Sequence, residues 1–503
     1  MWYSKRSPPR VPTDTVIRMH YFDDTIVFRT FVLYTLFVFD EVLDAQQLKS
    51  ALERVVTREG WNKLGGRLRR DESGQYLEIH VPETFSSERP AIGFTHVEES
   101  SQKAADHPVA SRIPKSPSGS RPAIAGDPSE LVPLVMGPDV PQSQDDYLYS
   151  DRPALGLRVV SFSDKTVVVL HWLHSLFDAV AMGAVLDAWT LALQGREEEI
   201  PTPQGVREDP LAEFGMYPTE KHVLADRRLY TSGLVKYGAN NILDITWRRK
   251  ANRVVCVPKA FLDKLRAQAM DDLAAAGYEN PFVSEGDVLV AWFSRIAAQN
   301  IPKDSDRTET LFDAGQLPQK VAIQNAYGQR PTLEKDHLLL PGRPYLSNCV
   351  GFVIALLPAR ELHAKPLGHT ALALRRALET QGRRAQLEAY AAVVRDDPKN
   401  KIIPLFGNAG MQLLMFSNWQ KARLFETNFS SAAVRPRDEE EEEAKKKPLR
   451  PSYVQAMQSP YSFPDGFMIP GKDALGNYWI GGDRVQTFWE MMEKEMASDD
   501  DSG

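Results

Sequence analysis

Two long apolar stretches meet at a short polar corner in the first half of the chain. Residues 166–173 are mostly β-branched and aromatic, a composition that favours a buried strand. Residues 179–194 are apolar nearly all round and end before Gly195, which predicts a buried helix. His174 and Asp178 lie between them, so an ionisable pair stands where a buried strand gives way to a buried helix.

The rest of the chain alternates between segments of the same two kinds. Short apolar runs predict strands at residues 28–39, 75–80, 157–162, 253–257, 319–323, 350–357, 412–416 and 478–480. Apolar residues at helical spacing predict helices at residues 45–57, 259–275, 284–298, 367–378 and 485–495. Ser284 is placed as the N-cap of one of these helices, with Asp287 three residues further on, a variant of the capping box.

Three other stretches lack this periodicity. Residues 86–144 are poorer in periodic apolar pattern and include a run rich in proline, serine and glycine, at 115–130, which is expected to form a loop. The segment that starts at residue 196 is polar with several prolines, which predicts a linker. The charge block at 438–447 is interpreted as a solvent-exposed loop or helical insertion. We therefore divide the chain into an N-terminal lobe (1–195), a crossover (196–248) and a C-terminal lobe (249–503).

Composition narrows the class of protein. At 503 residues, 43% of them hydrophobic, the chain has room for two domains with a substantial core. A net charge of −7 argues against nucleic acid or an anionic membrane as the main partner. Two cysteines give no disulfide framework and no metal-binding spacing, and the N-terminus lacks the apolar core of a signal peptide. We expect a cytoplasmic protein.

The corner pair has two interpretations. Burial of ionisable groups costs several kcal/mol unless they are satisfied, and histidine can take and return a proton near neutral pH. His174 could therefore be a general base that Asp178 holds in place. Alternatively, His174 is a satisfied core residue and Asp178 only caps the helix. The same spacing recurs at residues 20–24 and 222–226, in a polar stretch and on an expected charged helix face, so the apolar setting selects His174.

Other chemistries find little support in the sequence. There is no GxSxG motif to present a nucleophilic serine. His171 and His174 are three residues apart, and on an extended segment this odd separation points them to opposite faces. The pair does not make a joint metal site, no metal is expected, and His171 is interpreted as a core or wall residue.

At this point the order of motifs resembles the acyl-CoA-dependent acyltransferases of the BAHD family, especially the fungal branch that acylates terpenoid and polyketide alcohols. The resemblance covers most of the chain. His174 and Asp178 match the family's HxxxD motif. Further matching segments are Gly65–Leu68, the helix from Ser284 to Trp292, Arg330, the segment Tyr345–Val350, and Ser417-Asn418-Trp419.

One segment departs from the family pattern. The second motif, DFGWG, corresponds here to residues 428–432, Asn428-Phe429-Ser430-Ser431-Ala432. The phenylalanine remains, but the aspartate has lost its charge and both glycines are absent. By resemblance, Asn428 and Phe429 support the structure around the site and do not take part in the reaction.

The resemblance implies a fold, a reaction and partners. The fold would be α/β with two similar lobes, each a mixed sheet flanked by helices as in chloramphenicol acetyltransferase, and a tunnel between them. His174 would be the general base, Asp178 would pair with Arg330, and Ser417 and Trp419 would contact the substrate and the oxyanion. Acyl-CoA, most simply acetyl-CoA, would be a co-substrate of a monomer that has no tightly bound cofactor and takes a small-molecule alcohol as acceptor.

Alternative functions stay open at this stage. The same fold could use His174 in a CoA-independent proton transfer, such as a cyclisation, elimination or hydrolysis. It could also bind a metabolite without catalysis. A peptide-synthetase condensation domain fits less well, because its HHxxxDG motif needs adjacent histidines and Leu173 precedes His174 here.

Overall fold

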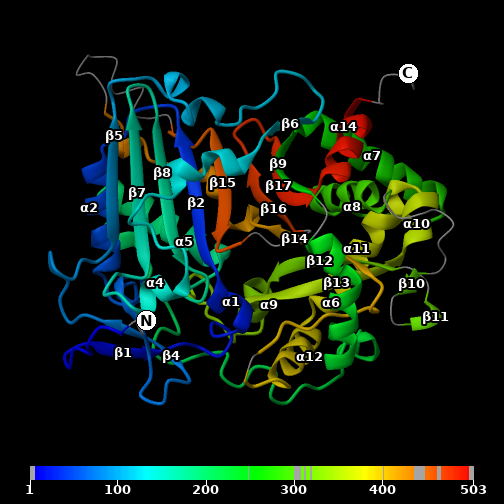
Figure 1. Cartoon of the computed structure of the whole chain (residues 1–503), viewed down its shortest axis with the longest axis horizontal. Helices are drawn as coiled ribbons and strands as arrows, with labels where there is room; N and C mark the ends of the chain where they lie inside the picture. Colours follow the sequence, from blue (N-terminus) through cyan, green and yellow to red (C-terminus); the bar gives the residue numbers. More distant parts are fainter. Residues whose placement is uncertain are drawn as a thin grey trace.

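In the computed structural model the chain forms two lobes, each built on one large β-sheet with helices beside it (Figure 1). This arrangement confirms the predicted α/β class. The structure describes residues 6–246, 249–299, 308–310, 313–317, 320–399, 401–434, 448–461 and 466–497. The charge block predicted at residues 438–447 and the C-terminal residues from 498 onward lie outside this part.

The first lobe is organised on a five-stranded sheet. In order across the sheet, the strands are β15 (Tyr453–Ser459), β2 (Val32–Phe39), β8 (Thr166–Leu173), β7 (Leu155–Phe162) and β5 (Gly93–Glu99). The pair β5–β7 is parallel and the other pairs are antiparallel. Every residue of β2 and β8 is buried, which explains why both strands read as continuous apolar runs and not as an alternating pattern. The helices α2 (Ala45–Val56) and α5 (Ala179–Leu193) pack together beside this sheet.

The second lobe is organised on a seven-stranded mixed sheet. In order, its strands are β13 (Val350–Pro358), β12 (Lys320–Gly328), β14 (Gln412–Asn418), β16 (Gly466–Lys472), β17 (Tyr478–Val485), β9 (Lys250–Val257) and β6 (Ala123–Gly126). The strands β12, β14 and β16 are parallel to one another. A second apolar core forms where this sheet meets α7 (Lys259–Ala275), α8 (Glu285–Ala298) and α11 (Leu367–Gln381).

Smaller elements surround the two sheets. The remaining strands are β1 (Thr15–Arg18), β3 (Arg67–Arg70), β4 (Leu77–Val81), β10 (Thr308–Thr310) and β11 (Asp313–Leu317). The remaining helices are α1 (Ile26–Thr30), α3 (Val132–Val135), α4 (Gln144–Leu148), α6 (Thr231–Thr246), α9 (Arg330–Lys335), α10 (Ala359–Ala364), α12 (Arg384–Arg395) and α14 (Gln486–Ala497). Within the described ranges, no helix combines the length and the apolar character needed to cross a membrane.

The two sheets exchange strands between distant parts of the sequence. Strand β15 lies near the C-terminus yet pairs with β2 of the first lobe, and β6 lies in the N-terminal part yet pairs with β9 of the second. The ranges 1–195 and 249–503 therefore do not by themselves assign every strand to a sheet. The division of the chain into lobes at these residue boundaries stays a prediction.

Some local predictions are confirmed and others are wrong. Strand β8 and helix α7 have the predicted bounds, and the capping box of Ser284 and Asp287 is present. The strand expected at 28–39 begins only at Val32, because helix α1 occupies residues 26–30. The Thr25 hydroxyl caps this helix by accepting from Phe28 N at 3.1 Å. The stretch at 86–144, where no strand was expected, contains β5 and β6, and β6 falls within the expected loop at 115–130. Strand β5 was missed because it lies at the edge of its sheet and has no apolar run.

The predicted crossover at 196–248 contains helix α6. One further expectation is corrected. His222 was expected on a charged helix face, but it lies in a loop, is buried and stacks on Phe406 with ring centroids 4.8 Å apart.

Helix α5 packs closely against the second half of the chain at Gly183, and this close contact requires a residue without a side chain. A Cβ at Gly183 would lie 2.7 Å from the Ala422 carbonyl oxygen and 3.0 Å from Ala422 Cα. We predict that Gly183→Ala lowers the free energy of unfolding by about 1–3 kcal/mol. Gly238→Ala in α6 is the control, since its Cβ would meet nothing within 4 Å. Denaturant titration of both variants measures the difference, and equal stability would contradict the prediction.

Candidate active site

The polar corner is fixed first by a helix cap. Strand β8 ends at Leu173, and α5 begins at Ala179 with Asp178 as its N-cap. The Oδ1 atom of Asp178 accepts hydrogen bonds from the backbone N–H groups of Val180 and Ala181, each at 3.1 Å. These donors would otherwise be unsatisfied in the first turn of a buried helix. Asp178 is therefore the N-cap of α5.

The second carboxylate oxygen of Asp178 joins the corner to the other lobe. Its Oδ2 accepts from Arg330 Nη1 at 2.9 Å and from the backbone N–H of Cys349 at 2.8 Å. Arg330 also donates through Nη2 to the carbonyls of Tyr345 and Ser347. Burial opposes the charge on Arg330, but the Asp178 carboxylate, together with Cys349 and Tyr345, outweighs it and raises the pKa of the guanidinium. The predicted pairing of Asp178 with Arg330 is thus present.

His174 occupies the first position of the turn and is held from three sides. Its backbone N–H donates to the Phe31 carbonyl at 2.9 Å, and its own carbonyl accepts from Asn348 Nδ2 at 2.9 Å. The imidazole stacks on Phe28, with ring centroids 4.3 Å apart and an interplanar angle of 20°. Its Nδ1 atom is fully buried. Nε2 is therefore the ring nitrogen that can face open space.

The electrostatic surroundings keep this imidazole in its neutral form. Burial is the largest influence and lowers the pKa of His174 below its ordinary value of 6.5. Its own backbone carbonyl, the Asp178 charge, the Asn348 side chain and the Asp23 charge act in the opposite direction. A neutral imidazole at physiological pH can accept a proton, as a general base must.

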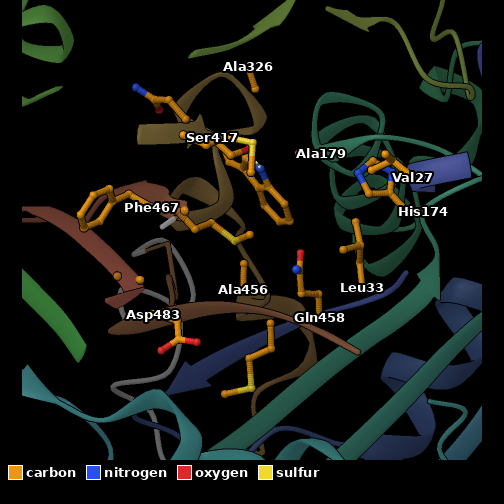
Figure 2. A pocket seen from close by; sticks show the side chains of 18 of the residues that line it. Val27, Leu33, His174, Ala179, Ala326, Ser417, Ala456, Gln458, Phe467 and Asp483 are labelled. Atoms are coloured by element: carbon orange, nitrogen blue, oxygen red, sulfur yellow. Dashed lines mark hydrogen bonds between the residues drawn. The ribbon is translucent and has the colours of Figure 1, made fainter. Parts of the chain in front are cut away.

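His174 opens onto a cavity of about 570 Å³ between the two sheets. Figure 2 shows the His174 ring on one side of this cavity and Ser417, Phe467 and Asp483 on the other. Strands of both sheets supply the walls, with Leu33 from β2 facing residues of β12, β14 and β16. The lining is mainly apolar and includes the side chains of Met136, Met415, Met457 and Met468. The predicted cavity between two lobes is present.

Ser417 and Trp419, predicted to contact the substrate, both line the cavity at the end of β14. The indole Nε1 of Trp419 donates to the Ser417 Oγ at 2.9 Å. Trp419 has thereby used its only side-chain donor, whereas the Ser417 hydroxyl still has its proton to give. Of the two oxyanion candidates, Ser417 is the one whose donor is available.

Asn428 and Phe429, the remnant of the second family motif, do not line the cavity. The Asn428 Oδ1 accepts from the backbone N–H groups of Ser430 and Leu449, at 3.1 and 2.9 Å. Phe429 is fully buried, stacks on Phe39 and meets the edge of Trp189 in α5. An amide oxygen accepts these two bonds as a carboxylate would, so the loss of charge leaves the local turn intact.

His171 is confirmed as a core residue. Its side chain is buried, and its Nδ1 lies 3.5 Å from the Tyr147 hydroxyl. Burial, together with the charges of Arg152 and Arg158, lowers its pKa to about 3. His171 is therefore not a second base at this site.

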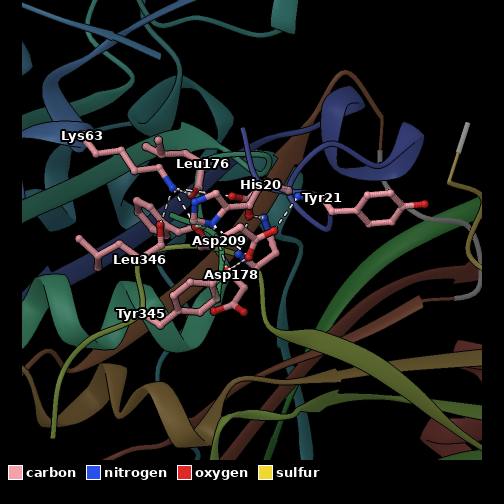
Figure 3. Close-up of polar contacts among 12 residues, drawn as sticks. His20, Tyr21, Lys63, Leu176, Asp178, Asp209, Tyr345 and Leu346 are labelled. Carbon is pink, nitrogen blue, oxygen red and sulfur yellow. Dashed lines mark hydrogen bonds and ion pairs between the residues drawn. The ribbon is translucent and has the colours of Figure 1, made fainter. Parts of the chain in front are cut away.

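A buried polar cluster behind His174 escaped the sequence analysis. The stretch at 20–24 was set aside as polar, yet His20, Asp23 and Asp24 are all buried. Figure 3 shows His20 and Lys63 converging on the segment that includes Tyr345 and Leu346. The available signal was the family-like segment around Asn348, which the structure places directly against His174.

Comparisons with known proteins agree with this geometry. The chain is 35% identical to the acetyltransferase adrJ of Penicillium rubens, over 98% of both chains. It is also 35% identical to a protein named transcriptional regulator calD, from Penicillium decumbens, over 98% of this chain and 97% of that protein. No protein-family model matches the chain.

The fold is shared with solved structures of other proteins. TRI101 of F. sporotrichioides, crystallised with coenzyme A and T-2, superposes with a TM-score of 0.65 at 15% identity, covering 96% of this chain and 97% of TRI101. Vinorine synthase superposes with a TM-score of 0.57 at 14% identity, covering 98% and 95% of the two chains. At these identities the likeness concerns the fold, and it confirms the two-lobed architecture.

The altered second motif yields a prediction. Asn428→Asp should leave both stability and turnover within about twofold, because the carboxylate can accept the same two backbone hydrogen bonds. Asn428→Ala should lower the free energy of unfolding by about 1–3 kcal/mol, since two partly buried backbone N–H groups lose their acceptor. Thermal denaturation and turnover assays of the two variants check this. A gain of tenfold or so in turnover for Asn428→Asp would show that the segment acts in the reaction.

Proposed function

The chain belongs to the fungal branch of the acyl-CoA-dependent BAHD acyltransferases, and on that premise we propose that it transfers an acetyl group from acetyl-CoA to a hydroxyl of a terpenoid or polyketide metabolite. The observation that carries this proposal is the orientation of the corner. The Asp178 carboxylate is turned back onto Arg330, while the neutral His174 ring faces the cavity between the lobes.

The proposed reaction is a direct transfer with His174 as general base. Nε2 of His174 removes the proton of the acceptor hydroxyl as its oxygen attacks the thioester carbonyl carbon. The carbonyl oxygen becomes an oxyanion, which the Ser417 hydroxyl stabilises by donating a hydrogen bond. When the C–S bond breaks, the imidazolium returns its proton to the thiolate. The products are the acetyl ester and free CoA, and the histidine is again neutral.

Asp178 acts in this scheme by position. Its carboxylate satisfies two N–H groups of α5, the guanidinium of Arg330 and the backbone N–H of Cys349. This leaves it no proton-transfer role and fixes the turn that carries His174. The Arg330 pair crosses from one lobe to the other, so it also sets the distance between His174 and the cavity wall that bears Ser417.

The cavity supports a bulky and mainly apolar acceptor. A volume of about 570 Å³ lies within the range of pockets that enclose a drug-sized molecule. Methionine side chains adapt to irregular surfaces, and four of them line the walls. Gln455, Gln458 and Asp483 offer a few polar contacts to orient a substrate with more than one oxygen. The protein is proposed to act as a cytoplasmic monomer.

One relative's name gives a second candidate function. A regulator with this fold would bind a metabolite in the cavity and turn nothing over, as the name of calD suggests for that protein. Release of free thiol from acetyl-CoA in the presence of polycyclic alcohols separates the two. Turnover supports the transferase, whereas metabolite binding with neither thiol release nor CoA binding supports the regulator.

Removal of the base is the first test of the mechanism. His174→Ala should lower kcat/KM by about 10²–10⁴-fold, the usual contribution of a positioned general base. The thermal denaturation midpoint should remain near that of the wild type, with His369→Ala on the surface of α11 as the control histidine variant. Activity within about tenfold of wild type, or about 1.4 kcal/mol in barrier, would exclude His174 as the base.

The pH dependence gives a second test. Only neutral His174 can accept the proton, and burial lowers its pKa below 6.5. The value of kcat/KM should therefore rise with pH through a midpoint below 6.5 and then reach a plateau. Initial rates measured over a pH series check this. An acid limb with its midpoint above 6.5 would contradict the environment described for His174.

A further inference from the structure

The cluster behind His174 contains a connected path of buried side chains. Asn348, at the end of the segment before β13, is almost fully buried and lies between His174 and Asp23. Asp23 is fully buried in the stretch before α1, and Lys63 lies on its far side with Nζ 3.7 Å from the Asp23 Oδ2. We refer to Asn348, Asp23 and Lys63 as the rear cluster.

The orientation of the Asn348 amide follows from its neighbours. Its Nδ2 lies 2.9 Å from the His174 carbonyl oxygen and 2.9 Å from the Asp23 Oδ1, and both of these atoms only accept hydrogen bonds. The nitrogen must therefore be on that side of the amide. Its Oδ1 is buried without a donor, and Nδ1 of the adjacent His174 ring is buried without an acceptor. A hydrogen bond from an Nδ1–H of His174 to the Asn348 Oδ1 would satisfy both atoms.

Asp23 is the charge nearest to this amide. Its Oδ1 accepts from both the backbone N–H and Nδ2 of Asn348, at 2.6 and 2.9 Å. Asp178 cannot serve His174 in the same way, because both of its oxygens are occupied by the helix cap, Arg330 and Cys349. A negative charge on Asp23 favours a positive charge on the imidazole, reached through the amide of Asn348.

Other charged groups surround the path. His20 and Asp209 lie on the side of Tyr345, where His20 Nδ1 is 3.1 Å from the Tyr345 hydroxyl and 3.7 Å from the Asp209 Oδ1. Asp24, next in sequence to Asp23, is turned away and pairs with Arg29 and Lys401. Lys63 is thus the cation within 4 Å of Asp23 among the described residues.

Lys63 also ties the two lobes together at this point. Its Nζ donates to the Leu346 carbonyl at 2.7 Å and to the Ser347 Oγ at 2.8 Å. It also donates, at 3.4 Å, to the carbonyl of Leu176 in the polar corner that carries His174. Complete burial, only partly opposed by Asp23, lowers the pKa of its ammonium group. Removing Lys63 would therefore leave Asp23 with less compensation for its charge.

We propose that Asn348 and Asp23 are positioning residues for the reaction: the Asn348 Oδ1 accepts the Nδ1–H of His174, so that Nε2 stays unprotonated toward the cavity, and the Asp23 carboxylate behind the amide stabilises the imidazolium that forms. The Lys63 ammonium group partly compensates the negative charge of Asp23. The inference rests on the proposed function of His174 as general base.

Two substitutions should shift the pH profile in opposite directions. Asp23→Asn keeps an oxygen that can accept from Asn348 but removes the negative charge. The imidazolium is then less stable, so the acid limb of kcat/KM moves to lower pH and kcat on the plateau falls. Lys63→Met leaves Asp23 less compensated, so the acid limb moves to higher pH. Each shift should be about one unit, while the KM for acetyl-CoA stays within about twofold.

A third substitution tests the tautomer. In ¹⁵N-histidine NMR of the full-length protein without substrate, His174 should carry its proton on Nδ1 and leave Nε2 unprotonated. His174→Ala assigns this signal. Asn348→Ala should give a mixture of tautomers and lower kcat by about tenfold to a hundredfold. A cluster with a merely structural role would lower the stability of all three variants without opposed pH shifts and without a change of tautomer.

The outcomes separate this inference from the proposed function. No thiol release by the wild-type protein would overturn both. A wild type that turns over, a His174→Ala variant that does not, and pH profiles unchanged or shifted in the same direction would overturn the inference alone. If one of the two charge variants fails to fold, the pH profile of the other variant and the tautomer of His174 in the wild type test the inference. Wild-type His174 protonated on Nε2 would refute the proposal.

Discussion

The ion pair between Asp178 and Arg330 is the interaction on which the site depends. It stands where the first turn of α5, the start of α9 and the segment before β13 meet, and it satisfies donors from all three. Loss of one partner from such a buried pair costs about 3–5 kcal/mol, because the other charge stays buried without compensation. The pair therefore holds the two lobes in the one arrangement that opens the His174 ring to the cavity.

Around this pair, roles are divided between two aspartates. Asp178 is occupied by its cap and its guanidinium, so its geometry is rigid and its charge is already compensated. Asp23 lies on the other side of the turn that carries His174, reaches the imidazole through the amide of Asn348 and faces Lys63. Phe28 closes the remaining face of the ring by stacking on it. The imidazole is thus packed on three sides and open on the fourth.

The sequence was informative where chemistry and local pattern coincide. Strand β8, helix α5 and the corner between them were predicted because continuous apolar runs and an N-cap are local signals. Arg330, Ser417 and Trp419 were found by resemblance, and the structure places the arginine on Asp178 and the other two in the cavity wall. The edge strand β5 and the exchange of β15 between sheets were not predicted, since neither leaves an apolar run or a periodicity that reveals its partner.

The rear cluster was missed for a different reason. Asp23 and Lys63 are polar residues in short turns, which sequence analysis assigns to the surface by default. They are buried because three segments that are distant in sequence bring complementary charges together, and no single stretch carries that information. A buried polar network of this kind can be recognised only once the lobes have been placed against each other.

The most direct measurement of the central claim is chemical modification of the one imidazole that faces the cavity. Diethyl pyrocarbonate acylates neutral imidazole nitrogens, and mass spectrometry locates the modified histidines. We expect His174 to be modified at the same rate at which activity is lost, to be protected by bound CoA, and buried His171 to remain unreacted. Full activity in protein whose His174 is modified, or a His174 that stays unreacted while activity disappears, would contradict the assignment.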